Sequence, residues 1–355
     1  MTLSASRVVQ TEATAEYIPR EDWLARRSEA ALEPERMIVD AHVHMGDRQV
    51  FRYMLPELLA DIADGHDVRA TVFIEWRSMY RRAGPSEMRP VGEIEFINGI
   101  AAQAASGQYG PHYACSAIVG NADFTLGDRV EPVLEAMIRA GGGRFCGIRP
   151  TTKWHPPTGI APLPSTLPPG VMRQANFQDA ARCLGRLGLS LDIWGYHTQL
   201  PDILALARAV PGTTVIVNHC GGPLGIGPYA GQHETMMRDW KAGMAALARE
   251  PNVVVKVGGL GTLSAGFTFH KADRPPSSAE LADAWRPYIE TVIELFGASR
   301  CLFESNFPGD KRVCSYTILW NAFKRLAAAG TESEKTALFS GTAMQVYRIG
   351  LSDLT

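Results

Sequence analysis

The sequence carries little net charge and begins without a long apolar run. Its 35 lysines and arginines nearly balance 37 aspartates and glutamates, which gives a formal net charge of −2. This balance provides no electrostatic basis for binding nucleic acid or an anionic membrane surface. Residues 1–23 lack the apolar stretch of a secretory signal or a membrane span. We therefore expect a cytoplasmic protein with no nucleic-acid partner and no membrane association.

Motifs of several common enzyme classes are also missing. The chain has no GxGxxG turn, no P-loop and no GxSxG elbow, so nothing in it indicates a nucleotide site or a serine nucleophile. Low-complexity segments and short-period repeats are absent as well. The six cysteines are scattered without a CxxC pair, which is typical of reduced thiols that fill small spaces in a core; they are Cys115, Cys146, Cys183, Cys220, Cys301 and Cys314.

What the sequence does contain is a regular alternation. Residues 1–36 are polar, and "EDWLARRSEAALEPE" within them predicts an N-terminal arm with a short helix. From residue 37 on, short β-branched or apolar runs alternate with longer segments of helical periodicity, most of which end in Gly or Pro. The eight strand candidates are residues 37–44, 69–75, 112–120, 145–150, 189–197, 213–220, 252–259 and 300–307.

Eight such units predict an α/β protein with a (β/α)8 TIM barrel, spanning residues 37–355 as one domain after the arm of residues 1–36. A doubly wound open sheet is the alternative, but its glycine-rich first turn is not found in "HVHMGD". Two long segments interrupt the rhythm, at 77–92 after the second strand and at 151–174 after the fourth. Because both follow strand C-termini, we expect them to wall the barrel mouth.

Histidines occur where several predicted strands end. His42 and His44 are two residues apart in "DAHVH", so both point to one face of the strand and form half of a metal site. A pair of hydrogen-bonded core histidines is the alternative. Asp40 is expected to face the same way, one layer deeper. His197 and His219 follow the fifth and sixth strands, and strand ends converge on one mouth in a barrel.

The last predicted strand, in "RCLFESNFPGDK", ends with Glu304 and Asn306 on one face. Other polar and aromatic residues lie in segments near the mouth, and their arginines and lysines favour an anionic or carbonyl-rich small-molecule substrate. These residues are Arg77, Tyr80, Arg81, Trp154, His155, Tyr196, Phe269, His270 and Lys271.

Taken in order, "DAHVHMGD", "IRP", "WGYH", "VNHCGGP" and "FESNFP" resemble the amidohydrolase superfamily. The closest similarity is to its amidohydrolase-related branch of TIM-barrel metal-dependent hydrolases. Within that branch, the N-terminal arm and "RSMYR…GPSEMRPVGE" are similar to sugar-lactone and pyrone-dicarboxylate lactonases. The resemblance runs from about residue 17 to residue 350 and does not fix a substrate.

The resemblance implies roles for individual residues. His42, His44 and His197 correspond to metal ligands, and Arg149 of "GIRP" corresponds to an arginine that holds a substrate carboxylate or carbonyl. His219 corresponds to a histidine that often carries the proton in members with one metal ion. Arg77, Tyr80 and Tyr196 would complete the substrate site.

Two positions depart from the family pattern. Asn306 stands where most members have an aspartate that acts as general base, and an amide cannot accept a proton near neutral pH; it can still bind a metal weakly or orient a water. The carboxylated lysine of binuclear members has no clear counterpart, since the nearest lysine is Lys153. We therefore expect one divalent ion, Zn²⁺ for a three-histidine set, with Mn²⁺ or no metal as alternatives.

The function implied is opening of a lactone, or a similar cyclic ester of a carboxylated small molecule, by activated water. With an amide at 306, His219 is the expected proton carrier, and Glu304 either supports a histidine or acts as base. The alternative is a nonhydrolytic decarboxylase of an aromatic or enol carboxylic acid, and a catalytically silent binding barrel is the least favoured option. Barrels often pair, so a homodimer is an open expectation.

Overall fold

The computed structural model describes residues 18–48, 51–156, 160 and 168–350. Eight parallel strands form one sheet in the order β1-β4-β5-β6-β7-β8-β9-β10. The sheet closes on itself, because Val43 bridges Phe307 in parallel and the His44 N–H donates to the Phe307 carbonyl over 2.8 Å. The strands are β1 (Ile38–Val43), β4 (Val68–Ile74), β5 (Tyr113–Gly120), β6 (Phe145–Ile148), β7 (Ser190–Ile193), β8 (Val215–Val217), β9 (Val253–Gly258) and β10 (Cys301–Glu304).

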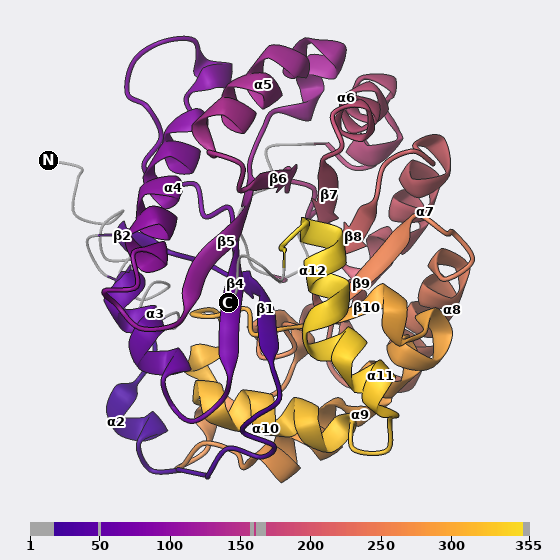
Figure 1. Cartoon of the computed structure of the whole chain (residues 1–355). Coiled ribbons are helices and arrows are strands. Elements are labelled where there is room, and N and C mark those ends of the chain that lie inside the picture. Colours follow the sequence, from indigo (N-terminus) through magenta and orange to yellow (C-terminus); the bar gives the residue numbers. More distant parts are fainter. Residues whose placement is uncertain (1–17, 49–50, 157–159, 161–167, 351–355) are drawn as a thin grey trace, which may run out of the picture.

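Helices lie outside this ring of strands, as Figure 1 shows, so the predicted (β/α)8 barrel is confirmed. Each of the eight predicted runs coincides with one strand of the barrel to within a few residues. The helices of the described residues are α2 (Glu21–Leu24), α3 (Leu55–Ile62), α4 (Val91–Ala105), α5 (Glu131–Ala140), α6 (Ala175–Arg186), α7 (Leu200–Ala209), α8 (His233–Leu247), α9 (Ser278–Phe296), α10 (Tyr316–Leu326), α11 (Glu332–Thr336) and α12 (Thr342–Tyr347).

Most strands are shorter than the apolar runs that predict them, and the difference in length matters at two places. β7 ends at Ile193 and β8 at Val217. His197 and His219 therefore begin short 3-10 turns, His197–Gln199 and His219–Gly221, instead of ending strands. A small antiparallel hairpin, β2 (Gly46–Arg48) with β3 (Phe51–Tyr53), also follows β1, and no strand was predicted there.

Two apolar clusters hold the barrel together. The larger lies between the strands and the surrounding helices, and the smaller fills the barrel interior near the beginnings of the strands. The smaller cluster joins inward-facing residues such as Val39, Val254 and Leu302 to Tyr347 of α12. Figure 1 shows α12 lying across this end of the barrel. The opposite end, where the strands finish, is left for polar residues.

The described part of the predicted arm packs against the last helical region. Trp23 of α2 is buried and donates from Nε1 to the carbonyl of Ala272 over 2.9 Å. Further along, the N–H of Leu32 donates to Asn321 Oδ1 of α10 over 2.8 Å. The helix of this segment covers only four residues, Glu21–Leu24.

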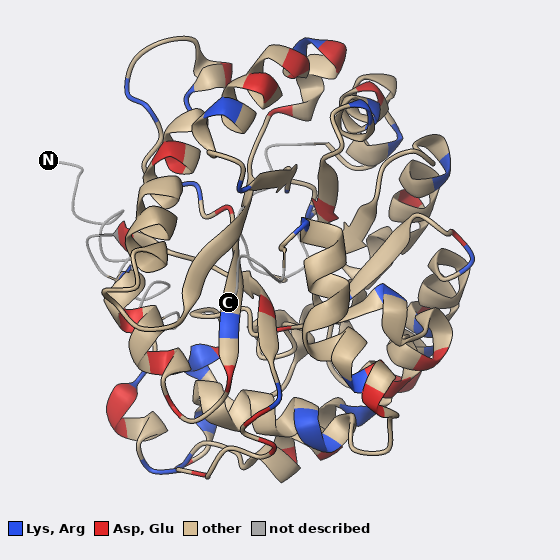
Figure 2. Ribbon diagram, viewed as in Figure 1, with Lys and Arg blue, Asp and Glu red and all other residues tan. Residues whose placement is uncertain are grey.

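Charges of both signs are interspersed over the outer helices in the view of Figure 2. Among the described helices, none is long and apolar enough to cross a membrane. All six cysteines are free and buried, as the sequence predicts for core thiols.

Candidate active site

The two histidines at the end of β1 place their Nε2 atoms next to each other. Nε2 of His42 lies 3.1 Å from Nε2 of His44, and both rings are buried. Nδ1 of His44 lies 2.8 Å from the Ile74 carbonyl, which can only accept, so that nitrogen carries the proton. Burial first, and then the nearby cations, hold the pKa of both imidazoles well below 6.5, so both are neutral.

Glu304, at the end of β10, contacts the Nδ1 atoms of two imidazoles. Its Oε2 lies 2.7 Å from Nδ1 of His42, and its Oε1 lies 2.7 Å from Nδ1 of His219. The backbone N–H of His219 also donates to Oε1 over 3.0 Å. Burial alone would raise the pKa of this fully buried carboxyl, but His219 and Lys256 outweigh burial and lower it below 4.5. Glu304 is therefore an ionised acceptor that directs both Nε2 atoms away from itself.

Glycines make room for this arrangement. A Cβ on Gly259 would lie 2.1 Å from His219 Nδ1, and one on Gly258 would lie 2.6 Å from the Glu304 side chain. His219 and Asn306 both have positive φ, 53° and 55°, which non-glycine residues seldom adopt. Such backbone costs about 1–3 kcal/mol each and is typical of functional sites.

These nitrogens fit a divalent cation. With Nδ1 of His42 turned to Glu304 and Nδ1 of His44 to a carbonyl, two lone pairs converge at 3.1 Å with no proton between them. Neutral imidazole is the form that binds zinc. One group of chelating side chains was found among the described residues, and it consists of His42, His219 and Glu304. Within that group the short contacts run from imidazole Nδ1 to carboxylate, so the Nε2 atoms face away from the carboxylate.

Arg149, directly after β6, reaches the same nitrogens. Its Nη1 lies 3.2 Å from His42 Nε2, and its Nε donates to Glu75 Oε1 over 3.0 Å. Nη2 donates to the backbone carbonyl of Glu75, also over 3.0 Å. Glu75 thus fixes Nε and Nη2 of the guanidinium, and Nη1 faces the histidines.

A buried ion pair lies beneath the histidines and was not predicted. Nζ of Lys256, in the middle of β9, is 2.8 Å from Asp192 Oδ1 of β7, and both side chains are fully buried. The same ammonium is 3.3 Å from His42 Nδ1, farther than Glu304 is. The lysine within "NVVVKVGG" was the available sequence signal, since a charge seldom interrupts a buried strand without a partner.

The Asn306 amide is hydrogen-bonded to Asp310, an acid that was not predicted from the sequence. Its Nδ2 donates to Asp310 Oδ1 over 2.8 Å, and Asp310 Oδ2 accepts from the Gly261 N–H over 2.9 Å. Burial raises the pKa of Asp310 to about 6, although Arg312 and Asn306 oppose the rise. An amide at 306 supplies the donor that a second carboxylate could not supply without a proton. Asp310 follows Asn306 by one helical turn, and this spacing was the signal that could have revealed it.

His197 lies with a different group of side chains. Its ring is 4.9 Å from that of Tyr229, whose hydroxyl is 3.1 Å from His155 Nε2. Nδ1 of His197 is buried without a hydrogen-bond partner among the described residues, and burial lowers its pKa to about 4. The chain turns after β7, which sets His197 apart from the Glu304 contacts. Tyr196, next to it, is buried and receives Lys153 at 5.6 Å from its ring.

The loop after β4 carries the other predicted substrate residues. Arg77 is half exposed; it donates to Thr151 Oγ1 over 2.7 Å, and its Nε lies 3.7 Å from Glu75 Oε2. Burial first, and then the charges of Glu93 and Glu75, raise the pKa of Tyr80. Glu93 of α4 ties the loop down, because its Oε1 accepts the N–H groups of Trp76 and Ser78 over 3.0 and 2.9 Å.

The expected direction of Asp40 is wrong. Its Oδ2 accepts from Tyr316 of α10 over 2.9 Å, and its Oδ1 accepts the Ser305 N–H over 2.9 Å. A register irregularity between Asp40 and Val43 breaks the strict alternation of β1. Asp40 thus fastens β1 to its neighbours and does not stand beneath the histidine rings.

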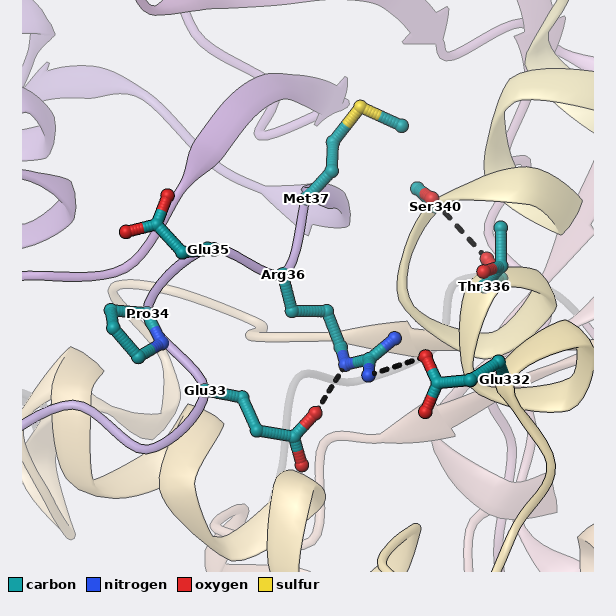
Figure 3. Close-up of a pocket in the computed structure, with 8 residues that line it drawn as sticks. All are labelled: Glu33, Pro34, Glu35, Arg36, Met37, Glu332, Thr336 and Ser340. Carbon is teal, nitrogen blue, oxygen red and sulfur yellow. Dashed lines mark hydrogen bonds and ion pairs between the residues drawn. The ribbon is translucent and has the colours of Figure 1, made fainter.

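A surface pocket lies at the other end of the barrel, before β1, and Figure 3 shows its lining. Its central cation is already paired, since Arg36 contacts Glu33 at 2.6 Å and Glu332 at 3.0 Å. We therefore place the candidate active site at the histidine cluster and not in this pocket.

Exchanging the amide and acid tests the pairing of Asn306 with Asp310. Asn306→Asp alone places two carboxylates in contact, and we expect it to lower the free energy of unfolding at pH 7 by about 1–3 kcal/mol. The double variant Asn306→Asp/Asp310→Asn restores one donor and one acceptor, so it should recover most of the loss in urea unfolding. If the double variant is as unstable as Asn306→Asp, the hydrogen bond does not explain the amide.

Glu93 gives the loop a pH-dependent anchor. Burial first, and Glu75 second, raise the pKa of Glu93 from 4.5 to about 7. The folded state therefore holds this proton more tightly than the unfolded state, so stability falls as the pH rises from about 4.5 through 7, by roughly 3 kcal/mol. Urea unfolding between about pH 5 and pH 8 should show a smaller fall for Glu93→Gln than for the parent. The exposed Glu95→Gln on the same helix is the control and should keep the parent slope; equal slopes for all three proteins would contradict the assignment.

Known sequences match most of the chain. The profile of the family described as Amidohydrolase matches residues 39–349. The uncharacterized protein y4mH of Sinorhizobium fredii is 32% identical over 297 residues, which cover 84% of this chain and 86% of that protein. An L-fucono-1,5-lactonase of Burkholderia multivorans is 24% identical over 159 residues, covering 44% of this chain and 51% of the lactonase.

Solved structures share the fold. An amidohydrolase from Burkholderia multivorans with bound zinc has a TM-score of 0.65 at 21% identity, and the match covers 89% of this chain and 100% of that one. For a candidate 2-pyrone-4,6-dicarboxylic acid hydrolase from Pseudomonas putida the values are 0.54 and 17%, with 90% and 98% covered. For a 2,6-dihydroxybenzoate decarboxylase with bound 2,6-dihydroxybenzoate they are 0.50 and 10%, with 88% and 99% covered.

The structural likenesses, all at low identity, establish the barrel. The profile match spans most of the sequence, and the Sinorhizobium relative is matched along most of its own length. The chain therefore belongs to the amidohydrolase family of hydrolases.

Proposed function

We propose that this chain opens a lactone, or a similar cyclic ester of a carboxylated small molecule, by attack of water at the histidine cluster. The observation that carries the proposal is the convergence of His42 Nε2, His44 Nε2 and Arg149 Nη1 within 3.1–3.2 Å contacts at the strand ends. Neutral nitrogens beside a fixed guanidinium suit an ester carbonyl. The partly matching L-fucono-1,5-lactonase supports a lactone as the ester.

His42 and His44 are the residues that would hold a single divalent ion, and zinc, found in the related Burkholderia barrel, is our choice. Such an ion supplies Lewis-acid polarisation of a carbonyl and lowers the pKa of a water molecule. His197 and Asn306 remain proposed ligands. The partnerless Nδ1 of His197 supports its inclusion, while Asn306 would have to ligate through its oxygen because its nitrogen serves Asp310.

Arg149 binds and orients the carbonyl oxygen of the substrate. Its guanidinium cannot rotate freely, because Glu75 holds Nε through a carboxylate oxygen and Nη2 through a backbone carbonyl. A positioned cation at an oxygen that gains negative charge stabilises the transition state. Arg77 and Tyr196 would bound the same space from the loops after β4 and β7, and Tyr80 would support the first of these loops.

His219 moves the proton. Its Nδ1–H donates to ionised Glu304 over 2.7 Å, which leaves Nε2 as the acceptor. Nε2 takes a proton from the attacking water as the carbonyl carbon gains its new C–O bond. The same nitrogen returns the proton to the ring oxygen as the ring C–O bond breaks, so the product is a hydroxy acid and the protein ends unchanged. Glu304 stabilises the imidazolium between the two transfers.

Decarboxylation of an aromatic or enol carboxylic acid is the second candidate. Asn306 favours it, because the usual aspartate base is absent and the His219–Glu304 pair could instead deliver a proton to carbon as CO₂ leaves. A similar barrel occurs in a 2,6-dihydroxybenzoate decarboxylase, which supports this candidate.

Metal content tests the ligand assignment. Elemental analysis of protein purified without chelator should give at most one divalent ion per chain. His42→Ala and His44→Ala should lose it, because their Nε2 atoms are its donors, whereas His219→Ala should retain it. Loss in His197→Ala would add that residue to the ligand set. Two ions per chain, or full retention in His42→Ala, would contradict the site.

A substrate panel tests the reaction. We expect acid release from carboxylated lactones, followed with a pH indicator, and no CO₂ release from hydroxybenzoates. His219→Gln should lower kcat by about 10²–10⁴-fold, the usual contribution of a general acid–base group, with metal content unchanged. The exposed His233→Gln is the control and should keep parent kcat. CO₂ release without ring opening would replace the lactonase proposal by the decarboxylase one.

A further inference from the structure

Lys153, in the long loop after β6, is a partly buried cation without a counter-ion. Its Nζ lies 3.8 Å from the centre of the Trp194 ring and 5.6 Å from that of Tyr196. No carboxylate of the described residues forms an ion pair with it. The undescribed parts of the same loop, residues 157–159 and 161–167, contain no Asp or Glu in the sequence.

Other cations surround this lysine instead. Arg149 and Arg77 share the single carboxylate of Glu75, at 3.0 and 3.7 Å. Burial, followed by repulsion from these two arginines, lowers the pKa of Lys153 to about 8, so it is still largely charged at neutral pH. Two of these three cations share one carboxylate, and Lys153 pairs with no carboxylate of the described residues. Glu93, a carboxylate close to Glu75, accepts hydrogen bonds from backbone N–H groups of the loop after β4.

The indole under Lys153 also touches the proposed proton carrier. The rings of Trp194 and His219 are 5.4 Å apart, edge to face, and the Arg149 guanidinium lies 5.9 Å from the same indole. Trp194 thus fixes the ammonium at one side of the reacting centre through a cation–π contact. A group bound by the ammonium would be held beside the bond that His219 acts upon.

We propose that Lys153, seated on Trp194 beside Arg149 and Arg77, binds the carboxylate of the substrate and so selects an anionic ester over a neutral one. The inference rests on the proposed function, because the anion is taken to be part of the same small molecule. An ammonium offers three N–H donors and tolerates several carboxylate directions. Its contact is the same before and during reaction, so its loss raises KM more than it lowers kcat.

Matched lactones test the subsite. The substrates are 5-oxotetrahydrofuran-2-carboxylate and its neutral methyl ester, measured at pH 7. Lys153→Met should raise KM for the carboxylate by about 10–100-fold, the effect of losing a charged hydrogen bond, with kcat and the ester KM nearly unchanged. Lys153→Arg should restore most of the affinity. Lys241→Met, an exposed lysine of α8, is the charge-matched control and should behave as the parent.

Binding of glutarate, which has no ester bond, gives a readout independent of turnover. Titration calorimetry should show binding to the parent that weakens about tenfold or more in Lys153→Met and not in Lys241→Met. If neither lactone is opened while glutarate binding requires Lys153, the anion subsite stands and lactone hydrolysis fails. If both lactones are opened and Lys153→Met changes neither glutarate binding nor KM, the subsite is overturned and hydrolysis stands. Failure of glutarate to bind the parent more tightly than its dimethyl ester also overturns the subsite.

Discussion

The contact of Glu304 with two imidazoles is the interaction on which the site depends. A carboxylate with no exposed surface would be costly unless N–H donors contacted it. Here Nδ1 and the backbone N–H of His219 donate to Oε1, and Nδ1 of His42 lies 2.7 Å from Oε2. By accepting at both Nδ1 positions, Glu304 leaves both Nε2 atoms as acceptors. The close approach requires a left-handed backbone at His219 and two glycines, Gly258 at the end of β9 and Gly259 directly after it.

The barrel interior divides into two levels with opposite chemistry. Near the strand beginnings it is apolar and closed by α12, while near the strand ends it holds charges in pairs. Arg149 with Glu75 and Lys256 with Asp192 are nearly or fully buried pairs of this kind. Buried ion pairs seldom add stability over apolar packing. The Lys256–Asp192 pair lies where the two levels meet, because Tyr347 of α12 donates to Asp192 Oδ1 over 3.1 Å. Lys153 stands out against this background, because every other cation of the cluster has a carboxylate in contact.

The fold could be predicted from the sequence because each β/α unit has a local pattern: a short apolar run, then a segment of helical periodicity that in most units ends at Gly or Pro. The grouping of His42, His44 and His219 followed from the rule that strand ends converge. The expected direction of Asp40 needed local geometry and was wrong, because an irregularity in β1 turns this side chain toward Tyr316. The early end of β7 was not predicted either, and it places His197 in a turn beside Tyr229. Partners from distant strands, such as Lys256 and Asp192, carry no local signal.

The amide at position 306 can be understood from its neighbour. Asp310 keeps an acid close to the usual place of the catalytic aspartate, but both of its oxygens are occupied, one by Asn306 and one by the Gly261 N–H. It is therefore poorly placed to accept a proton from water. Glu304 is the carboxylate that contacts the histidines, and it does so through Nδ1 atoms on the far side of the rings. Under the proposed function, proton movement passes through Nε2 of His219, with the charge of Glu304 behind the ring; an asparagine at position 306 then changes which residue carries the proton without removing the means to carry it.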